Sequence, residues 1–159
     1  MFKLPTVCLR SFCKGLVRRG YATDTENAMK LTFAAANKVF YDEASVKQVD
    51  VPSFSGSFGI LAHHVPSLAV LKPGVVTVFE NSGTSKQFFV SSGTVTINED
   101  SSVQVLAEEA CEVDQLDSSA IREILSKAQS EYASATNEEA KEEAAVVVEV
   151  AEALSKAVS

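Results

Sequence analysis

The side chains best suited to chemistry in this 159-residue chain are two adjacent histidines, His63 and His64, and the cysteine Cys111. Adjacent residues of a strand point to opposite faces of a sheet, so the two imidazoles would not converge on one metal ion. A thiol nucleophile would need a histidine beside Cys111, and the sequence places none there. We therefore interpret the histidines as structural or interface residues and the cysteine as a buried thiol, and we predict no metal site and no catalytic residue.

Carboxylates form the other group of candidate residues. They cluster at Glu108-Glu109, Glu138-Glu139 and Glu142-Glu143. General acid and base catalysis needs two carboxylates held apart in a cleft with different environments, whereas consecutive acidic residues are typical of a solvated helix face. The phosphate-binding pattern Gly-x-x-x-x-Gly-Lys-Ser/Thr is absent. The sequence therefore predicts neither a hydrolase site, nor a nucleotide site, nor a cofactor.

The first 23 residues differ in composition from the rest of the chain. They contain no acidic residue and five basic ones, namely Lys3, Arg10, Lys14, Arg18 and Arg19. No continuous apolar run is long enough for a signal-peptide core, so the pattern favours a mitochondrial transit peptide over residues 1–21. Arg19-Gly20-Tyr21-Ala22 resembles a matrix-peptidase site, with the arginine two residues before Tyr21. We therefore place the cut after Tyr21, which makes Ala22 the first mature residue. The alternative is a basic tail that the mature protein retains.

Cleavage at this point would leave a clearly acidic protein. The mature chain keeps nine of the 14 basic residues and all 21 acidic ones, a net charge of −12. Such a charge argues against nucleic acid and anionic membrane surfaces as direct partners. No apolar run approaches the roughly 18 residues that span a bilayer, so we expect no direct membrane insertion.

Residues 22–113 have the pattern of a β domain. Apolar residues recur with period two, as in Met29-Lys30-Leu31-Thr32-Phe33 and Val103-Gln104-Val105. Candidate strands begin near residues 29, 38, 46, 67, 75, 87, 94 and 103, with polar turn signals between them. Short strands at regular spacing predict an antiparallel sandwich or barrel.

Residues 114–159 are rich in alanine and glutamate and predict an antiparallel two-helix hairpin. Asp117 is a candidate N-cap for the first helix, and Thr136 with Glu139 forms a capping box that would open the second. Apolar residues repeat at three and four positions in both helices. The residues expected to pack the hairpin are Ile121, Ile124, Leu125, Ala128 and Tyr132 in the first helix, and Ala140, Ala144, Val147, Ala151, Leu154 and Val158 in the second.

Three valines of the second helix lie outside this stripe. Val146, Val148 and Val150 would face away from the seam between the helices. A helix that is apolar on more than one side has a second packing partner.

The segment from Gly56 to Gly74 contains residues that restrict or release the backbone. Gly56 and Gly59 allow a positive φ or a close approach of two backbones, whereas Pro66 and Pro73 fix φ. Lys72-Pro73-Gly74 has the composition of a type II turn. These residues predict a stiff surface segment that meets a partner.

The order Gly-x-x-Gly-Ile-Leu, His64, Pro66 and Leu71-Lys72-Pro73-Gly74 resembles the small central-stalk subunit of F-type ATP synthases, the delta/epsilon family. The similarity extends upstream to Val49-Asp50-Val51-Pro52 and downstream to Phe89-Val90-Ser91-Ser92-Gly93 and Val103-Gln104-Val105-Leu106-Ala107-Glu108. It therefore covers most of the chain.

The resemblance implies a sandwich of about ten strands followed by the helical hairpin. It implies a non-catalytic rotor subunit on the matrix side of the mitochondrial inner membrane, which links the rotating shaft to the membrane ring so that proton flow is coupled to ATP synthesis. The partners would be a gamma-type shaft subunit, a c-type ring and the small mitochondrial epsilon subunit. The residues of the ring and shaft interface would be Gly56, Ser57, Phe58, Gly59 and His64.

Two departures from the family pattern are visible. An acidic residue is common in the family where this chain has Ser57. The ATP-binding motif of some bacterial members is matched only in its first half, at Leu116-Asp117, because its arginine is missing. Binding of ATP is therefore not expected. The alternative function is a free regulatory or adaptor module of the matrix that binds protein or nucleotide.

Overall fold

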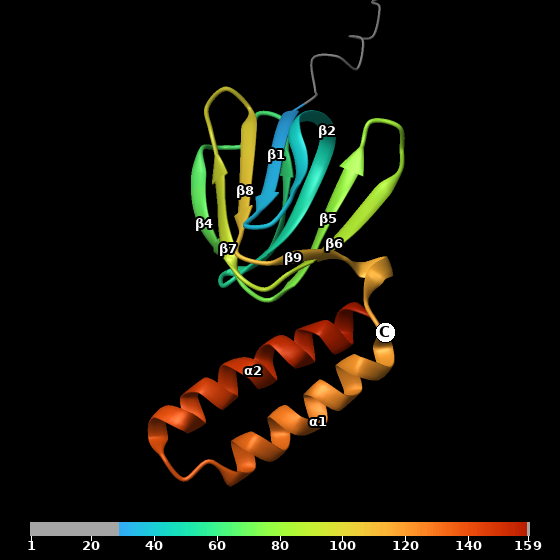
Figure 1. The fold of residues 1–159 in the computed structure, drawn as a ribbon. Helices are drawn as coiled ribbons and strands as arrows, with labels where there is room; N and C mark the ends of the chain where they lie inside the picture. Colours follow the sequence, from blue (N-terminus) through green and yellow to red (C-terminus); the bar gives the residue numbers. More distant parts are fainter. Residues whose placement is uncertain (1–28, 159) are drawn as a thin grey trace, which may run out of the picture.

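A computed structural model describes residues 29–158 of the chain. The predicted transit peptide and the predicted cleavage site at Tyr21 and Ala22 lie outside the described residues. The described chain forms a β-sandwich, and a pair of antiparallel helices lies against one end of it (Figure 1). The predicted fold class is thereby confirmed, with nine strands in the described residues in place of about ten.

The strands are β1 (Met29–Ala35), β2 (Val39–Ser53), β3 (Gly56–Leu61), β4 (Ser67–Leu71), β5 (Gly74–Glu80), β6 (Ser85–Val90), β7 (Gly93–Ile97), β8 (Ser102–Ala107) and β9 (Ala110–Glu112). A 3-10 turn over Val113–Gln115 leads into helices α1 (Ser118–Ser134) and α2 (Glu138–Ala157).

The long strand β2 connects the two layers of the sandwich. Its first half pairs with β1, and its second half pairs with β3 on one edge and β5 on the other. The sequence pattern suggested two strands here, near residues 38 and 46. They merge because an irregularity in the register lets one strand bend between the layers. The pairing of β1 with β8 is parallel, and the other pairings are antiparallel.

The core of the sandwich contains the inward-facing residues of the period-two pattern. Leu31 and Phe33 of β1 are completely buried, and so are residues of β2, β5 and β8. The Phe33 ring is stacked on Phe40 with 5.0 Å between centroids and meets Phe88 edge-on at 5.2 Å. Aromatic contacts of this kind add to the stabilisation that burial provides.

The helix starts differ in how they are capped. The Asp117 carboxylate accepts a hydrogen bond from the Ser119 backbone N–H at 2.8 Å, as predicted for an N-cap. Hydrogen bonds from the Ser119 hydroxyl and backbone lower the pKa of the Asp117 carboxyl. The predicted capping box at Thr136 is wrong, because α2 starts one residue later, with Asn137 at the N-cap and no side-chain cap bond. Glu138 and Glu139 in the first turn still favour the helix through its dipole.

The helices pack through a narrower stripe than the sequence suggested. Ile121, Ala128 and Ala151 are buried, whereas Tyr132 and Val147 are 41% and 46% exposed. Leu125, Ala144, Val148 and Leu154 are half-buried, and Ile124 is 46% exposed. At 100° per residue, Ala144 and Ala151 share one face of α2. Val147 and Leu154 lie to one side of that face, with Val150 beyond them, on the side where α2 approaches the sandwich.

Candidate interaction surfaces

The segment predicted to be stiff contains two strands, of which β4 is the strand expected near residue 67 and β3 was not expected. Residues 56–61 form β3 and residues 67–71 form β4, with the histidine loop between them. Gly56 lies opposite Ser53 at the end of the sandwich near the helices, whereas His64 follows β3 at the other end. The structure therefore separates Gly56 from His64. It brings Phe58 and His64 together, with 6.2 Å between their ring centroids.

A glycine is required at position 59 because other side chains approach its backbone closely, and not because its φ is positive. Among the described glycines, Gly56 has a φ of 123°, whereas Gly59 and Gly74 are not in the positive region, so the expected type II turn at Gly74 is not formed. A Cβ at Gly59 would lie 2.8 Å from Asp50 Oδ1 and 3.1 Å from Gln48 Nε2. Gln48 donates a hydrogen bond of 2.6 Å to that Asp50 oxygen. This side-chain pair thus lies over β3 where a glycine leaves room.

We predict that Gly59→Val affects assembly more than folding. Because the neighbouring atoms belong to movable side chains, the isolated chain should lose about 1 kcal/mol of unfolding free energy. The displaced Asp50 carboxylate would change the exposed face of β3. In the rotor that the resemblance implies, coupling of ATP hydrolysis to proton pumping should therefore fall. Thermal melts of the isolated chain and proton-pumping assays of the assembled complex measure both effects. Normal coupling together with a normal melt would show that this face contacts no partner.

The end of the sandwich opposite the helices, called here the distal end, contains strained backbone. His63 and Ser101 have φ values of 61° and 62°, which is unusual for residues other than glycine. They are held together across 38 positions of sequence. The His63 backbone N–H donates to Ser101 Oγ at 3.2 Å, and that oxygen lies 3.3 Å from His63 Nδ1. Backbone strain of this kind often marks functional sites.

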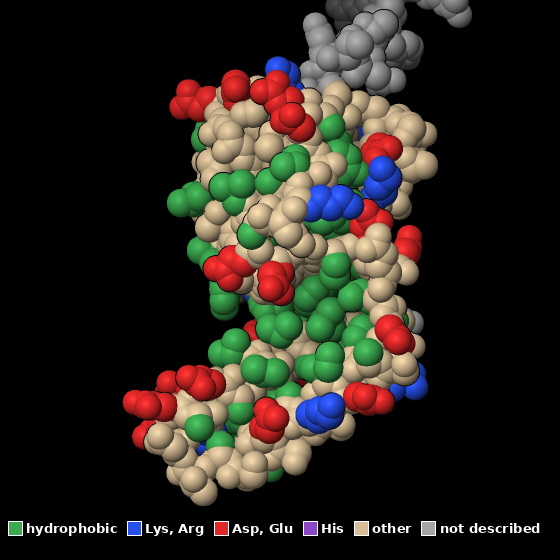
Figure 2. Space-filling view, viewed as in Figure 1, with side chains coloured by type: hydrophobic (Ala, Val, Ile, Leu, Met, Phe, Trp, Pro, Cys, Tyr) green, Lys and Arg blue, Asp and Glu red, His purple; other side chains and the backbone are tan. Residues whose placement is uncertain are grey.

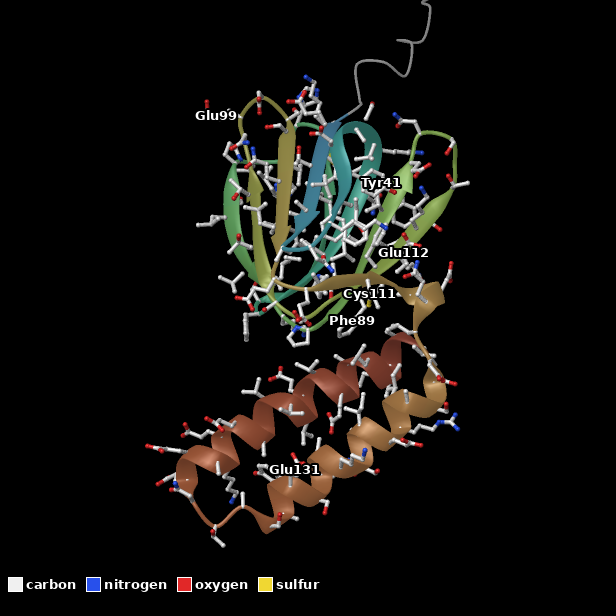
Figure 3. The ribbon with its side chains drawn as sticks, viewed as in Figure 1. Tyr41, Phe89, Glu99, Cys111, Glu112 and Glu131 are labelled. Carbon is white, nitrogen blue, oxygen red and sulfur yellow. The ribbon has the colours of Figure 1, made fainter. Side chains whose placement is uncertain are left out.

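The two histidines have different partners. His63 contacts Ser101, whereas Nδ1 of His64 lies 2.9 Å from the Val65 carbonyl oxygen. Within residues 29–158 no group of three potential metal ligands is present. Acidic side chains gather at this end, and Glu99 projects from the turn beside Ser101 (Figures 2 and 3).

A second surface is an exposed apolar face that sequence reasoning missed. Leu68 and Val70 of β4 are 73% and 53% exposed, and Leu106 of β8 is 52% exposed. The register places Val70 opposite Thr94 and Thr94 opposite Leu106, so the three large side chains lie on one side of the layer. Figure 2 shows hydrophobic side chains along this edge of the sandwich. The sequence Ser-Leu-Ala-Val-Leu of β4 could have revealed this face, because it has apolar residues at both odd and even positions. A strand of this kind is usually covered on both faces.

A third surface is the junction between the sandwich and α2. A cavity of about 520 Å³ lies there, lined by Phe89, Cys111, Leu116, Val150 and Leu154 among others. Figure 2 shows a cluster of hydrophobic side chains at the junction, and Figure 3 shows Phe89 and Cys111 above the helix. Burial, followed by the charge of Glu109, raises the pKa of the Cys111 thiol. A thiol in this state is a poor nucleophile.

Comparison with known proteins identifies the family. The model of the ATP synthase delta/epsilon chain, beta-sandwich domain, matches residues 28–113. The mitochondrial ATP synthase subunit delta of Caenorhabditis elegans is 47% identical over 148 residues, covering 89% of this chain and 90% of that protein. The Yarrowia lipolytica protein of the same name is 38% identical and covers 98% of both chains.

A solved structure has the same fold. A chain of the cryo-EM structure of the Euglena gracilis mitochondrial ATP synthase superimposes with a TM-score of 0.78 at 21% identity, covering 99% of this chain and 91% of that one. No helix in the described part is long and apolar enough to cross a membrane. By its sequence similarity over nearly its whole length, the chain belongs to the ATP synthase delta/epsilon-chain family.

Proposed function

We propose that this chain is a non-catalytic central-stalk subunit of the mitochondrial ATP synthase, placed on the matrix side of the inner membrane. It would link the rotating gamma-type shaft to the c-type ring, so that proton flow drives ATP synthesis. The observation that carries this proposal is the 47% identity to a mitochondrial delta subunit over 89% of the chain. We divide the protein into a transit peptide over residues 1–21, a sandwich domain over 22–113 and a helical hairpin domain over 114–159.

The distal end is the surface that we propose for the ring. His63 and Ser101 tie two turns together there, which gives a stiff contact surface. Torque transmission needs such stiffness, because a compliant contact would absorb rotation before it reached the shaft. His64 belongs to this surface. Gly56, Ser57 and Gly59 lie on β3 and are more suitable for a contact at the side of the sandwich.

The apolar face of β4 and β8 is the surface that we propose for the shaft. Leu68, Val70 and Leu106 are exposed in the isolated chain. A contiguous exposed apolar area on a soluble domain marks a site of protein association. The face begins with Leu68 at the distal end of β4 and reaches Leu106 near the opposite end of β8, so one rigid sandwich can hold both partners.

The exposed valines in the middle of α2 form the surface that we propose for the small epsilon subunit. Val146 and Val147 are 61% and 46% exposed, and they lie near the midpoint of the helix. Val150 lines the junction cavity, so the sandwich already covers part of the second apolar side of the helix.

We predict that Val146→Ser and Val150→Ser have separable effects. Val146→Ser should weaken retention of the small subunit and leave the isolated chain unchanged, because Val146 contacts solvent there. Val150→Ser should also loosen the hairpin by about 1 kcal/mol, because it removes apolar contact at the junction. Subunit stoichiometry in the purified complex and hydrogen exchange across residues 117–158 measure these effects. Full retention of the small subunit in the Val146→Ser complex would contradict the proposed surface.

Native gel electrophoresis of mitochondrial membranes solubilised in mild detergent tests the function as a whole. The chain should migrate with the ATPase-active complex and should leave it only under conditions that dissociate the rotor. The alternative, a free adaptor module of the matrix, predicts migration as a small species apart from the ATPase activity.

A further inference from the structure

We infer that the free edge of β3 is a strand-addition site, where an extended segment of another polypeptide continues the sheet. Within residues 29–158, β3 pairs with β2 alone. An edge strand presents a row of unpaired N–H and C=O groups to any strand that can reach it. This inference rests on the proposed function for the identity of the complex in which the partner strand is found.

The hydrogen bonds of β2 show which groups of β3 are free. The Pro52 carbonyl oxygen accepts a hydrogen bond from the Lys72 N–H at 3.2 Å, so the backbone carbonyl of residue 52 points toward β4 and away from β3. The N–H and C=O of one strand residue point the same way, and the direction alternates along the strand. The backbone N–H and C=O groups of Val49 and Val51 therefore point toward β3, where they pair with the backbone groups of Ile60 and Phe58.

The free edge of β3 is consequently formed by Ser57, Gly59 and Leu61. The Leu61 carbonyl accepts from the His64 N–H at 3.2 Å in the following turn. The three N–H groups and the carbonyls of Ser57 and Gly59 have no partner in the described part of the chain. All three residues are exposed.

This edge lacks the features that protect other edge strands. Residues 56–61 contain no charged residue and no proline, and the side chains at Ser57 and Gly59 are small enough for another backbone to approach. Lysine, proline or a covering element usually blocks such an edge against unwanted pairing. An open, uncharged edge is the kind that a partner strand covers in an assembly.

The surroundings of the edge select the chemistry of the added strand. The Asp50 carboxylate, held by Gln48 at 2.6 Å, lies across Gly59 on the outer face. A lysine or arginine opposite Gly59 in the added strand would reach this carboxylate, and an apolar residue would cover Leu61, which is 52% exposed. A second copy of this chain fits poorly, because antiparallel pairing about Gly59 would bring two Asp50 carboxylates together.

Residue-resolved hydrogen exchange on the purified ATP synthase and on the isolated subunit tests the inference. In the complex, the amides of Ser57 and Gly59 should exchange at least tenfold more slowly than in the isolated subunit. The amides of Phe58 and Ile60 should be protected in both samples, because they bond to β2. Unchanged exchange at Ser57 and Gly59 would overturn the inference. The inference would also be overturned if exchange at Phe58 and Ile60 slowed on assembly as much as exchange at Ser57 and Gly59.

Two variants give an independent measurement. Ser57→Pro removes one free N–H without removing a bond to β2, whereas Ser57→Ala keeps that N–H. The proline variant should be lost from the complex in a salt wash that the alanine variant survives; equal retention of two folded variants would contradict strand addition. A proline variant that does not fold leaves the exchange experiment as the deciding one. Protection of Ser57 and Gly59 in a dimer of the isolated subunit would overturn the choice of another polypeptide.

The failures of the two proposals are distinguishable. A chain that does not co-purify with the ATP synthase contradicts the proposed function. A chain that co-purifies with an unprotected β3 edge contradicts strand addition only.

Discussion

Replacing Phe33 with alanine should lower the unfolding free energy of the subunit by about 3–5 kcal/mol, a large part of the stability of a typical domain. Phe33 is fully buried in β1, and its ring contacts Phe40 and Phe88 at centroid distances of 5.0 and 5.2 Å. Removal of the ring loses both the buried apolar area and the aromatic contacts, and it leaves a cavity between the layers. Urea unfolding followed by circular dichroism measures the loss.

Phe54→Ala is the matched control for this prediction. Phe54 lies in the turn after β2 and is 72% exposed. Its truncation should change the unfolding free energy by no more than about 0.5 kcal/mol. Similar losses for Phe33→Ala and Phe54→Ala would show that the layers around Phe33 do not form the core described here.

Replacing Gly93 with alanine should have the second largest effect, a loss of about 3 kcal/mol or more. A Cβ at Gly93 would overlap the Leu106 carbonyl oxygen and would lie 2.9 Å from Ala107 Cα. Both atoms belong to the backbone of β8, which cannot rotate away as a side chain can. The first pair of the β7 and β8 ladder would have to separate, so the proposed shaft face would be lost with it. Thermal unfolding of the variant and its recovery in the complex measure these effects.

Gly83→Ala is the matched control, because it replaces a glycine that has no close contact of the kind that Gly93 makes with the backbone of β8. Gly83 has a φ of 87°, and a Cβ there would meet nothing within 4 Å. The substitution should cost only the strain of a positive φ, about 1 kcal/mol. Equal costs at Gly83 and Gly93 would mean that the close approach of β8 is unimportant.

Much of the fold was predictable from the sequence because its determinants are local. Alternation of apolar and polar residues marks half-buried strands, and the change to a period of three and four marks the helices. Asp117 was predictable as an N-cap because its bond to Ser119 spans two residues. The family was predictable because ordered motifs such as Gly56 to Leu61 and Leu71 to Gly74 extend over most of the chain.

The same locality explains what was missed. The segment from Gly56 to Leu61 has two glycines and only one clear apolar alternation, so β3 was not separated from the loop that follows. The capping box at Thr136 had the right residue types, yet α2 begins with Asn137 as its cap. Neighbouring polar residues compete for such a position with small energy differences, and the geometry of the turn decides between them.

The sequence by itself determined that a sandwich precedes a helical hairpin, which face of the clearly alternating strands β1 and β8 enters the core, and the family. Only the tertiary structure decided which edges and faces remain open. The contact of His63 with Ser101 joins residues 38 positions apart, and the free edge of β3 depends on β2 pairing with β3 on one side and β5 on the other. Periodicity shows that a surface is apolar, but whether another part of the chain covers it depends on long-range pairing. Leu68 and Val148 are both apolar residues with apolar neighbours in the sequence. The packing of the whole chain leaves Leu68 exposed and half-buries Val148.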